Sequence, residues 1–300
     1  MPSPAALVAS IPSPPSNGIT LGPIQLHIYG LMIALGIGAA VWIAQRQWSA
    51  MGGKSGTMAT LAIWGVPGGL IGARLYSVVT SYQEDTGGHF WRVFAVWQGG
   101  LGIWGGVVGG IALGLVGARR HGLRAAPLLD CVALAFPLAQ AIGRFGNYFN
   151  QELFGKPSGL PWAVQIDVVH RPAAYVAAST FQPTFLYEIL WDLLCLSVVI
   201  YVRGHVRLRR GHLFAVYVMA YTVGRFWIEY LRIDPAHRYG PLRLNDYTSI
   251  VVFSGAAIVV LLWGRARPGD DVVGAPLDAR DVDAEPSTGP STSTGPGPAS

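Results

Sequence analysis

The chain has 300 residues, of which 51% are hydrophobic and only 12% are charged, with a formal net charge of +5. Soluble domains carry about 25% charged residues, so the composition excludes an ordinary soluble protein and favours an integral membrane protein. The basic residues stand in short clusters between apolar segments, which membrane topology explains, so the positive charge does not indicate a nucleic-acid partner.

The first 22 residues contain no lysine or arginine. A secretory signal peptide begins with a positively charged region, so we expect no cleavable signal peptide. Residues 1–21 are rich in proline and serine, which predicts a flexible leader. The apolar segment that follows is long enough to remain in the bilayer.

Seven apolar segments of membrane-spanning length follow along the chain, where a helix needs about 17–25 residues to cross the hydrocarbon. The predicted spans are 22–44, 57–80, 99–118, 125–142, 183–201, 211–231 and 248–263. They predict an all-α, polytopic membrane domain over residues 22–267. Residues 268–300 are rich in Pro, Gly, Ser, Thr and Asp and are predicted to be disordered. Truncation after Pro268 is therefore expected to leave activity unchanged.

The loops between these spans differ in their basic residues. One set carries Arg46, Lys54, Arg119, Arg120, Arg124, Arg203, Arg207, Arg209, Arg210, Arg265 and Arg267. The other set begins with the uncharged N-terminus and carries fewer basic residues for its length. Because basic loops stay in the cytoplasm, the sequence predicts a cell-membrane protein with its N-terminus outside and its C-terminus inside.

With this orientation, polar side chains from five spans lie at one depth in the outer leaflet. They are Arg74, Arg144, Arg225, His27, Tyr29 and Glu188. Hydrocarbon contains no water to satisfy such groups, so they must pair with one another or with a polar ligand. Three arginines against few nearby carboxylates favour an anion, and a phospholipid head group is the anion expected there.

The alternative for each arginine is a purely structural role. Arg225 and Glu229 are four residues apart on one helical face, where a local ion pair forms readily. Arg74 is open to the same explanation. A structural role is least favoured for Arg144, which stands in the segment G-R-F-G-N-Y-F-N-Q-E-L-F-G. The polar side chains that crowd it there are Asn147, Asn150 and Glu152.

The remaining signals favour packing. The glycine-rich run at 99–110 lacks the Lys-Ser/Thr of a phosphate loop and is typical of helices that approach closely. Asp130 and Asp192 are predicted to lie away from the outer cluster as packing or capping partners. Cys131 and Cys195 fall inside apolar spans and are interpreted as small core residues. We expect neither a metal nor a cofactor.

The segment at 143–155 resembles the signature G-R-x-G-N-[FY]-x-N-x-E-x-x-G of the bacterial prolipoprotein diacylglyceryl transferases and matches every fixed position. Four further segments are similar to blocks of that family and stand in the same order. They are 22–32, 96–106, 182–188 and 224–232. The resemblance covers about residues 20–265 and leaves out both tails.

The resemblance implies the reaction and its substrates. Such enzymes move the diacylglyceryl group of phosphatidylglycerol onto the lipobox cysteine thiol of a preprolipoprotein, at the start of lipoprotein maturation. A thioether forms and glycerol 1-phosphate leaves. The matching positions imply that Arg144 holds the lipid phosphate and that Arg225 is a second essential arginine. The other positions that the family needs for activity are matched by Tyr29, Asn147, Glu152 and Gly155.

One position departs from the family pattern. Trp104 stands where proteobacterial members have a histidine that has been proposed as the base, and tryptophan cannot accept a proton. His27 is the nearest alternative base in the motifs, followed by Glu152, although a lone histidine beside an apolar span is more often structural. Two other functional classes fit the pattern less well. A lipid transporter would place polar groups throughout the membrane depth, and a structural scaffold would not need uncompensated arginines.

Overall fold

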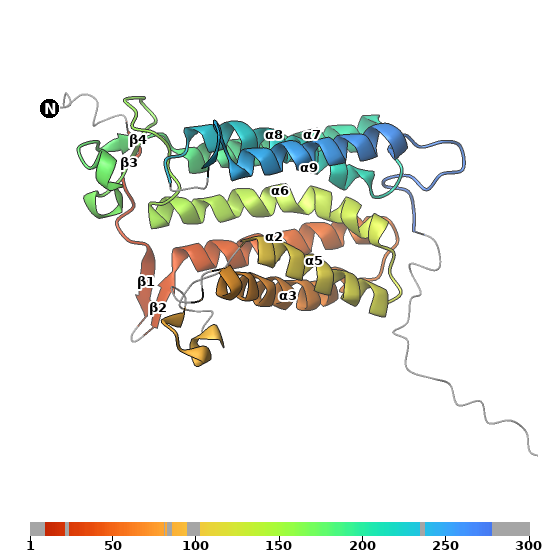
Figure 1. Ribbon diagram of the computed structural model, residues 1–300. Helices are drawn as coiled ribbons and strands as arrows, with labels where there is room; N and C mark the ends of the chain where they lie inside the picture. Colours follow the sequence, from red (N-terminus) through yellow and green to blue (C-terminus); the bar gives the residue numbers. More distant parts are fainter. Residues whose placement is uncertain are drawn as a thin grey trace, which may run out of the picture. The chain divides into compact units, whose positions relative to one another are not determined.

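The computed structural model describes residues 10–21, 24–80, 82, 86–94, 103–234 and 238–277. The chain forms two compact units (Figure 1). The large unit comprises Met1–Met51 and Ala126–Ala275, and the small unit comprises Gly52–Ala125 and Pro276–Ser300.

Long helices make up most of both units. The helices of the large unit are α2 (Ile28–Ala50), α6 (Ala125–Asn150), α7 (Thr184–His205), α8 (His212–Leu231) and α9 (Leu244–Trp263). The small unit contains α3 (Thr57–Thr80), α5 (Ile103–Arg120) and the short 3-10 helix η1 (Phe90–Phe94). A helix thus lies at each of the seven predicted positions within the described residues.

Five of these helices are long and apolar enough to cross a membrane, namely α2, α3, α6, α7 and α9. The prediction of a mostly helical, multi-pass membrane protein is confirmed at this level. The third predicted span begins at Gly99, outside the described residues, and α5 ends in Arg119 and Arg120. The sixth, α8, contains Arg225 and Glu229. Seven spans and their direction across the membrane therefore stay predictions.

Short antiparallel pairs accompany the helices, so the all-α expectation was incomplete. They are β1 (Gly18–Leu21) with β2 (Ile24–His27), β3 (Val164–Gln165) with β4 (Thr180–Phe181), and β5 (Arg238–Tyr239) with β6 (Leu242–Arg243). The first pair moves the start of the first helix from the predicted residue 22 to Ile28. His27 is consequently the last residue of a strand and not part of a span.

The predicted leader is partly ordered. The backbone N–H of Ile11 donates to the carbonyl of Ala163 at 2.8 Å, and Gln165 N–H donates back to Ile11 at 2.8 Å. The Ser13 hydroxyl donates to Asp167 at 2.9 Å, and the Gln151 amide donates to the same carboxylate at 2.6 Å. These hydrogen bonds hold the pKa of Asp167 below its usual range. Ile11 and Ser13 therefore contact the loop between α6 and α7.

Helix α6 continues eight residues beyond its predicted end and carries Arg144 and Asn147 on its last turns. It ends where Gln151 and Leu153 adopt left-handed backbone conformations, with φ of 51° and 57°. Side chains other than glycine rarely adopt such values, and the strain is about 1–3 kcal/mol each. The resulting reversal brings the N–H of Glu152 to the carbonyl of Asn147, at 3.1 Å.

Two apolar clusters stabilise the large unit. One is centred on α6, α7 and α8 and comprises Ala133, Leu134, Cys195, Val199, Leu208, Leu213 and Tyr217. The other joins the end of α6 and the start of α7 to the loop between them and comprises Ala141, Phe154, Val164, Ile166, Phe181, Phe185 and Ile189. Both Cys131 and Cys195 are buried free thiols, as predicted.

Glycines bring α3 and α5 into close contact in the small unit. A Cβ on Gly68 would lie 2.7 Å from the carbonyl oxygen of Gly109, and one on Gly109 would lie 2.9 Å from the Cα of Gly72. Real Cβ atoms do not approach so closely, so only glycine permits this packing. The interpretation of the glycine run as a helix-packing surface is confirmed for the described part of it.

Arg74 has a structural environment within the same unit. Its guanidinium is buried and donates to the carbonyl of Val93 at 2.8 Å and to the carbonyl of Arg92, both in η1. These bonds favour the structural explanation of Arg74 over a role in anion binding. Its shared depth with Arg144 and Arg225 stays a prediction.

The segment after α9 packs against the turn between α7 and α8. Arg210 forms an ion pair of 2.6 Å with Asp271, and the Val273 N–H donates to the Leu208 carbonyl at 3.1 Å. A bridge also joins Arg209 to Val272. Order therefore extends past Pro268, where disorder was predicted to begin, because the polar tail supplies a partner for a buried arginine.

Truncation after Leu277 is expected to leave thermal stability and activity unchanged, whereas truncation after Pro268 lowers the midpoint of thermal unfolding. The shorter chain lacks Asp271, while Arg210 has a side chain only 3% exposed. Because Asp271 is 38% exposed and screened by solvent, we expect a loss of about 1–2 kcal/mol. Equal unfolding midpoints for the two purified truncations would contradict this role of Asp271.

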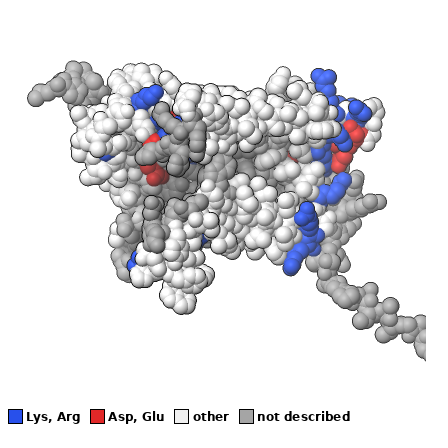
Figure 2. All heavy atoms as spheres, in the orientation of Figure 1, with Lys and Arg blue, Asp and Glu red and all other residues white. Residues whose placement is uncertain are grey.

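In the large unit, basic side chains gather at the end of α7 and in the turn that follows it (Figure 2). They include Arg203 in the last turn of α7 and Arg209 in the following turn. We expect a reporter fused after Arg267 to be cytoplasmic and one inserted in the 157–171 loop to be outside, since cytoplasmic loops are the basic ones. Reversed labelling in intact cells would refute the predicted orientation.

Candidate functional site

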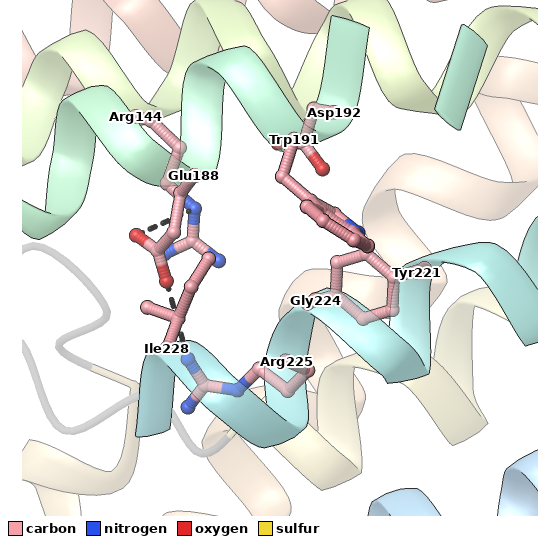
Figure 3. A pocket seen from close by; sticks show the side chains of 8 residues that line it. All are labelled: Arg144, Glu188, Trp191, Asp192, Tyr221, Gly224, Arg225 and Ile228. Atoms are coloured by element: carbon pink, nitrogen blue, oxygen red, sulfur yellow. Dashed lines mark hydrogen bonds and ion pairs between the residues drawn. The ribbon is translucent and has the colours of Figure 1, made fainter. Parts of the chain in front are cut away.

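Glu188 joins the two predicted site arginines. Its Oε2 lies 3.2 Å from Nε of Arg144, and its Oε1 lies 3.2 Å from Nη1 of Arg225 (Figure 3). The glutamate is 6% exposed. Arg144 belongs to the end of α6, Glu188 to the start of α7 and Arg225 to the second half of α8. Three helices thus converge at one end of the large unit.

The loop after α6 is hydrogen-bonded to the residues just before α7 and to the end of α8. The N–H of Gly155 donates to the Gln182 carbonyl at 2.9 Å, and the N–H of Lys156 donates to the Leu231 carbonyl at 3.0 Å. A Cβ on Gly155 would lie only 3.0 Å from the same Leu231 oxygen, which explains why glycine stands there. The hydroxyl of Thr184 donates to the Leu153 carbonyl. These hydrogen bonds hold the end of α6, the start of α7 and the end of α8 together around Arg144 and Arg225.

Carboxylates pair with more of the predicted positive charge than the sequence suggested. Besides sharing Glu188, Arg225 forms an ion pair of 2.7 Å with Glu229, one turn along α8. The local pair expected from the spacing of Arg225 and Glu229 is therefore confirmed, but Arg225 also reaches across to α7. The guanidinium groups of Arg144 and Arg225 are held by carboxylates that an incoming anion would have to displace.

Arg243 is a buried arginine that was not predicted. Its Nη1 lies 3.0 Å from Oε1 of Glu229, and the Asn245 amide donates to the same oxygen at 3.2 Å. Arg243 is 5% exposed and caps the start of α9, where it forms a capping box with Asp246. Its position just before the seventh predicted span was the available signal, but a basic residue there is usually solvated.

Asn147, Glu152 and Tyr29 form a second polar group beside Arg144. The Asn147 amide donates to Oε1 of Glu152 at 2.9 Å, and the Asn150 amide donates to the same oxygen at 3.3 Å. The ring of Tyr29 packs on Gly146, where a Cβ would lie 2.5 Å from its Cδ2. Tyr29 lies within electrostatic range of both Glu152 and Arg144. The structure therefore brings four predicted site residues together.

His27 is exposed, ends strand β2 and pairs through its backbone with Gly18. Its position two residues before Tyr29 places it at the start of α2. The side chain of Trp104 lies outside the described residues.

A small cleft opens beside the arginines and is shown in Figure 3. Its lining consists of Arg144, Glu188, Trp191, Asp192, Tyr221, Gly224, Arg225 and Ile228. The prediction that Asp192 lies away from the cluster is wrong, because it follows Glu188 by one turn of α7 and lines the same cleft. Asp130 acts as the predicted cap and accepts from the N–H groups of Gly211 and Leu213 at the start of α8.

Gly224 shapes one wall of this cleft. The indole N–H of Trp191 donates to the Ala220 carbonyl at 2.9 Å, so the ring lies flat across α8. A Cβ on Gly224 would lie 2.5 Å from Cγ of that indole and closer still to its other ring atoms. Glycine is therefore required for Trp191 to close this side of the cleft.

Comparisons with known proteins place these residues in context. The family described as "Prolipoprotein diacylglyceryl transferase" matches residues 17–263. The phosphatidylglycerol–prolipoprotein diacylglyceryl transferase 2 of Streptomyces coelicolor is 46% identical over 285 residues, which are 93% of this chain and 90% of that protein. The phosphatidylglycerol–prolipoprotein diacylglyceryl transferase of Cutibacterium acnes is 48% identical over 87% of this chain and 90% of its own length. The corresponding protein of Mycobacteroides abscessus is 43% identical over 91% of this chain and 84% of its own.

Proposed function

Because the chain belongs to the prolipoprotein diacylglyceryl transferase family, we propose that it transfers the diacylglyceryl group of phosphatidylglycerol to the lipobox cysteine thiol of a preprolipoprotein. A thioether forms and glycerol 1-phosphate leaves, in the first step of lipoprotein maturation. The protein acts in the cell membrane, with the arginine cluster facing the outer leaflet.

The observation that supports this reaction is the convergence of Arg144 and Arg225 on Glu188 beside the cleft. A guanidinium offers a planar fork of donors that matches a phosphate as well as it matches a carboxylate. The lipid phosphate therefore replaces Glu188 as the shared partner of the two arginines. Glu188 keeps both guanidinium groups in place until the lipid binds.

The arginines stabilise the charge that develops during transfer. The cysteine sulfur attacks the carbon of the diacylglyceryl group that bears the phosphate. The bond from that carbon to the phosphate oxygen breaks, and the thiol proton is released. The phosphate thereby changes from a singly charged diester to a more highly charged monoester. Fixed donors aimed at developing charge lower the barrier most in a site that excludes water. A cation nearby also increases the thiolate fraction of a thiol whose ordinary pKa is about 8.5.

Glu152 and Tyr29 belong to the same proposed site. Glu152 is held by Asn147 and lies within electrostatic range of Tyr29, which is itself within range of Arg144. This placement favours Glu152 over the exposed His27 as the group that receives or relays the thiol proton. Asn147 then acts by fixing the direction in which the Glu152 carboxylate points.

A lipid transporter fits the arrangement less well. In the large unit, the ion pairs made by Arg144, Arg225 and Arg243 lie at one end of the helices and do not continue along them. Transport across the bilayer needs polar groups at successive depths, whereas a transferase needs them at one depth.

The direct test uses the purified full-length protein in detergent micelles with phosphatidylglycerol labelled in its acyl chains and a synthetic lipobox peptide. We expect label on the peptide and release of glycerol 1-phosphate in equal amounts. A peptide with serine in place of the lipobox cysteine is the control. Lipid binding without label on the cysteine peptide would refute the transferase and favour a lipid carrier.

For the proton acceptor, we expect Trp104→His to raise the rate modestly at most, and His27→Ala to lower it more than Trp104→Phe does. General-base catalysis contributes about 10²–10⁴-fold only where the geometry fits, and arginine-assisted departure of phosphate reduces the need for it. The measurement is the pH dependence of kcat/KM. A gain of several orders of magnitude in Trp104→His would show that a base on α5 limits the reaction.

A further inference from the structure

Asp192 is a buried carboxyl group whose role the proposed chemistry leaves open. It is 2% exposed, lies on α7 and lines the cleft that holds Arg144 and Arg225. Its Oδ2 is buried and accepts no hydrogen bond from the described residues. A buried polar atom without a partner is unfavourable by about 1–3 kcal/mol, so such an atom in a binding cleft indicates a ligand group that completes it.

The cleft has two chemically different sides, as Figure 3 shows. Arg144, Glu188 and Arg225 form an ionic column along one side. Asp192, Trp191 and Tyr221 lie on the other, with the indole of Trp191 between the acid and the tyrosine ring. The indole N–H is already used by the Ala220 carbonyl. Asp192 therefore supplies an unpaired acceptor oxygen, Oδ2, to the lining of the cleft, within electrostatic range of Arg144.

This inference rests on the proposed function, which assigns the lipid phosphate to the ionic column. What lies beyond the phosphate in phosphatidylglycerol is a short uncharged chain with two hydroxyl groups. Asp192 lines the same cleft as the two arginines. When the arginines hold the phosphate, the head group attached to it therefore lies beside Asp192. Hydroxyl donors match the acceptor oxygens of a carboxyl group, whereas a head group without hydroxyls leaves them unpaired.

We propose that Asp192 determines lipid specificity by accepting a hydrogen bond from a head-group hydroxyl, so that the cleft selects phospholipids with polyol head groups. A site built to bind a substrate hydroxyl discriminates against the analogue that lacks it, because the buried partner is then left unsatisfied. Asp192 determines which head group is accepted, whereas Arg144 and Arg225 bind the phosphate that all phospholipids share.

The test compares phosphatidylglycerol with phosphatidylpropanol, which has the same three-carbon head group and charge but no hydroxyls. With the wild-type protein we expect kcat/KM for the lipobox peptide reaction to favour phosphatidylglycerol by about 10–100-fold, the range of one hydrogen bond to a charged group. In Asp192→Leu the preference falls to about twofold or less, chiefly through loss of activity with phosphatidylglycerol. Asp192→Asn keeps one acceptor oxygen and retains part of the preference.

Cys195→Ala is the matched control, since Cys195 is buried on the same helix but does not line the cleft. It keeps the wild-type preference. Equal rates with the two lipids in the wild-type protein would overturn the proposal whatever the variants do, and so would an unchanged preference in Asp192→Leu. A wild-type protein that transfers neither lipid would instead refute the proposed function. Phosphatidylethanolamine is the third substrate, and a preference for it that depends on Asp192 would overturn polyol selection in favour of ammonium binding.

Discussion

Replacement of Arg144 by alanine is expected to lower kcat/KM for diacylglyceryl transfer by about 10³-fold or more while the protein remains folded and inserted. The guanidinium of Arg144 faces the cleft and shares Glu188 with Arg225, so its removal takes away one of the two donors proposed for the lipid phosphate. Loss of one fixed donor to a developing anion typically lowers the rate by about 10²–10³-fold, and loss of lipid binding adds to this. Single-turnover transfer with purified protein is the measurement.

Arg144→Lys distinguishes geometry from charge. A lysine ammonium keeps the positive charge but cannot bind phosphate through two parallel donors, so we expect most of the activity to be lost here too. Arg209→Ala is the matched control, because Arg209 is 45% exposed and pairs with Asp270 at the opposite end of the large unit. It leaves transfer unchanged. Near-normal transfer by purified Arg144→Ala would exclude Arg144 as the phosphate ligand.

Hydropathy predicted where helices lie because the bilayer sets their length. The predicted spans 57–80 and 183–201 agree with the helices Thr57–Thr80 and Thr184–His205. It missed the β1–β2 pair, since the apolar residues Ile24 and Leu26 of β2 run directly into the helix and were counted with the first span. Residues that end a helix are also poorly predicted. The chain reversal after Asn150 depends on a left-handed backbone conformation at Gln151, which no pattern in the sequence predicts.

The sequence predicted which residues form the candidate site better than it predicted which of them form ion pairs. Arg225 and Glu229 were expected to pair because a helix brings residues four apart together, and they do. The link from Arg225 to Glu188 depends on which faces of α7 and α8 meet, and nearly uniform apolar surfaces carry little information about helix rotation. Asp192 was placed wrongly for the same reason. Its spacing of four from Glu188 was the signal that places both on one face of α7.

Glu229→Ala is the second change from which we expect a large effect, on stability and on kcat together. Glu229 is 1% exposed and lies between two guanidinium groups, at 2.7 Å from Arg225 and 3.0 Å from Arg243. Removing one partner from a buried ion pair typically destabilises a protein by about 3–5 kcal/mol, because the remaining charges stay buried. Arg225 would also lose the contact that fixes it to the start of α9. Thermal unfolding and transfer kinetics of purified protein measure the two effects.

A double-mutant cycle separates positioning from general damage. Arg243→Met removes one of the two cations, so combined with Glu229→Ala it leaves a smaller buried imbalance than Glu229→Ala alone. We expect the double variant to regain most of the unfolding midpoint, since replacing both partners of a buried pair is often nearly neutral. If Glu229 positions Arg225 for the phosphate, kcat stays low in the double variant although its stability is restored, while KM changes less. Recovery of kcat in parallel with stability would show that Glu229 contributes only to folding.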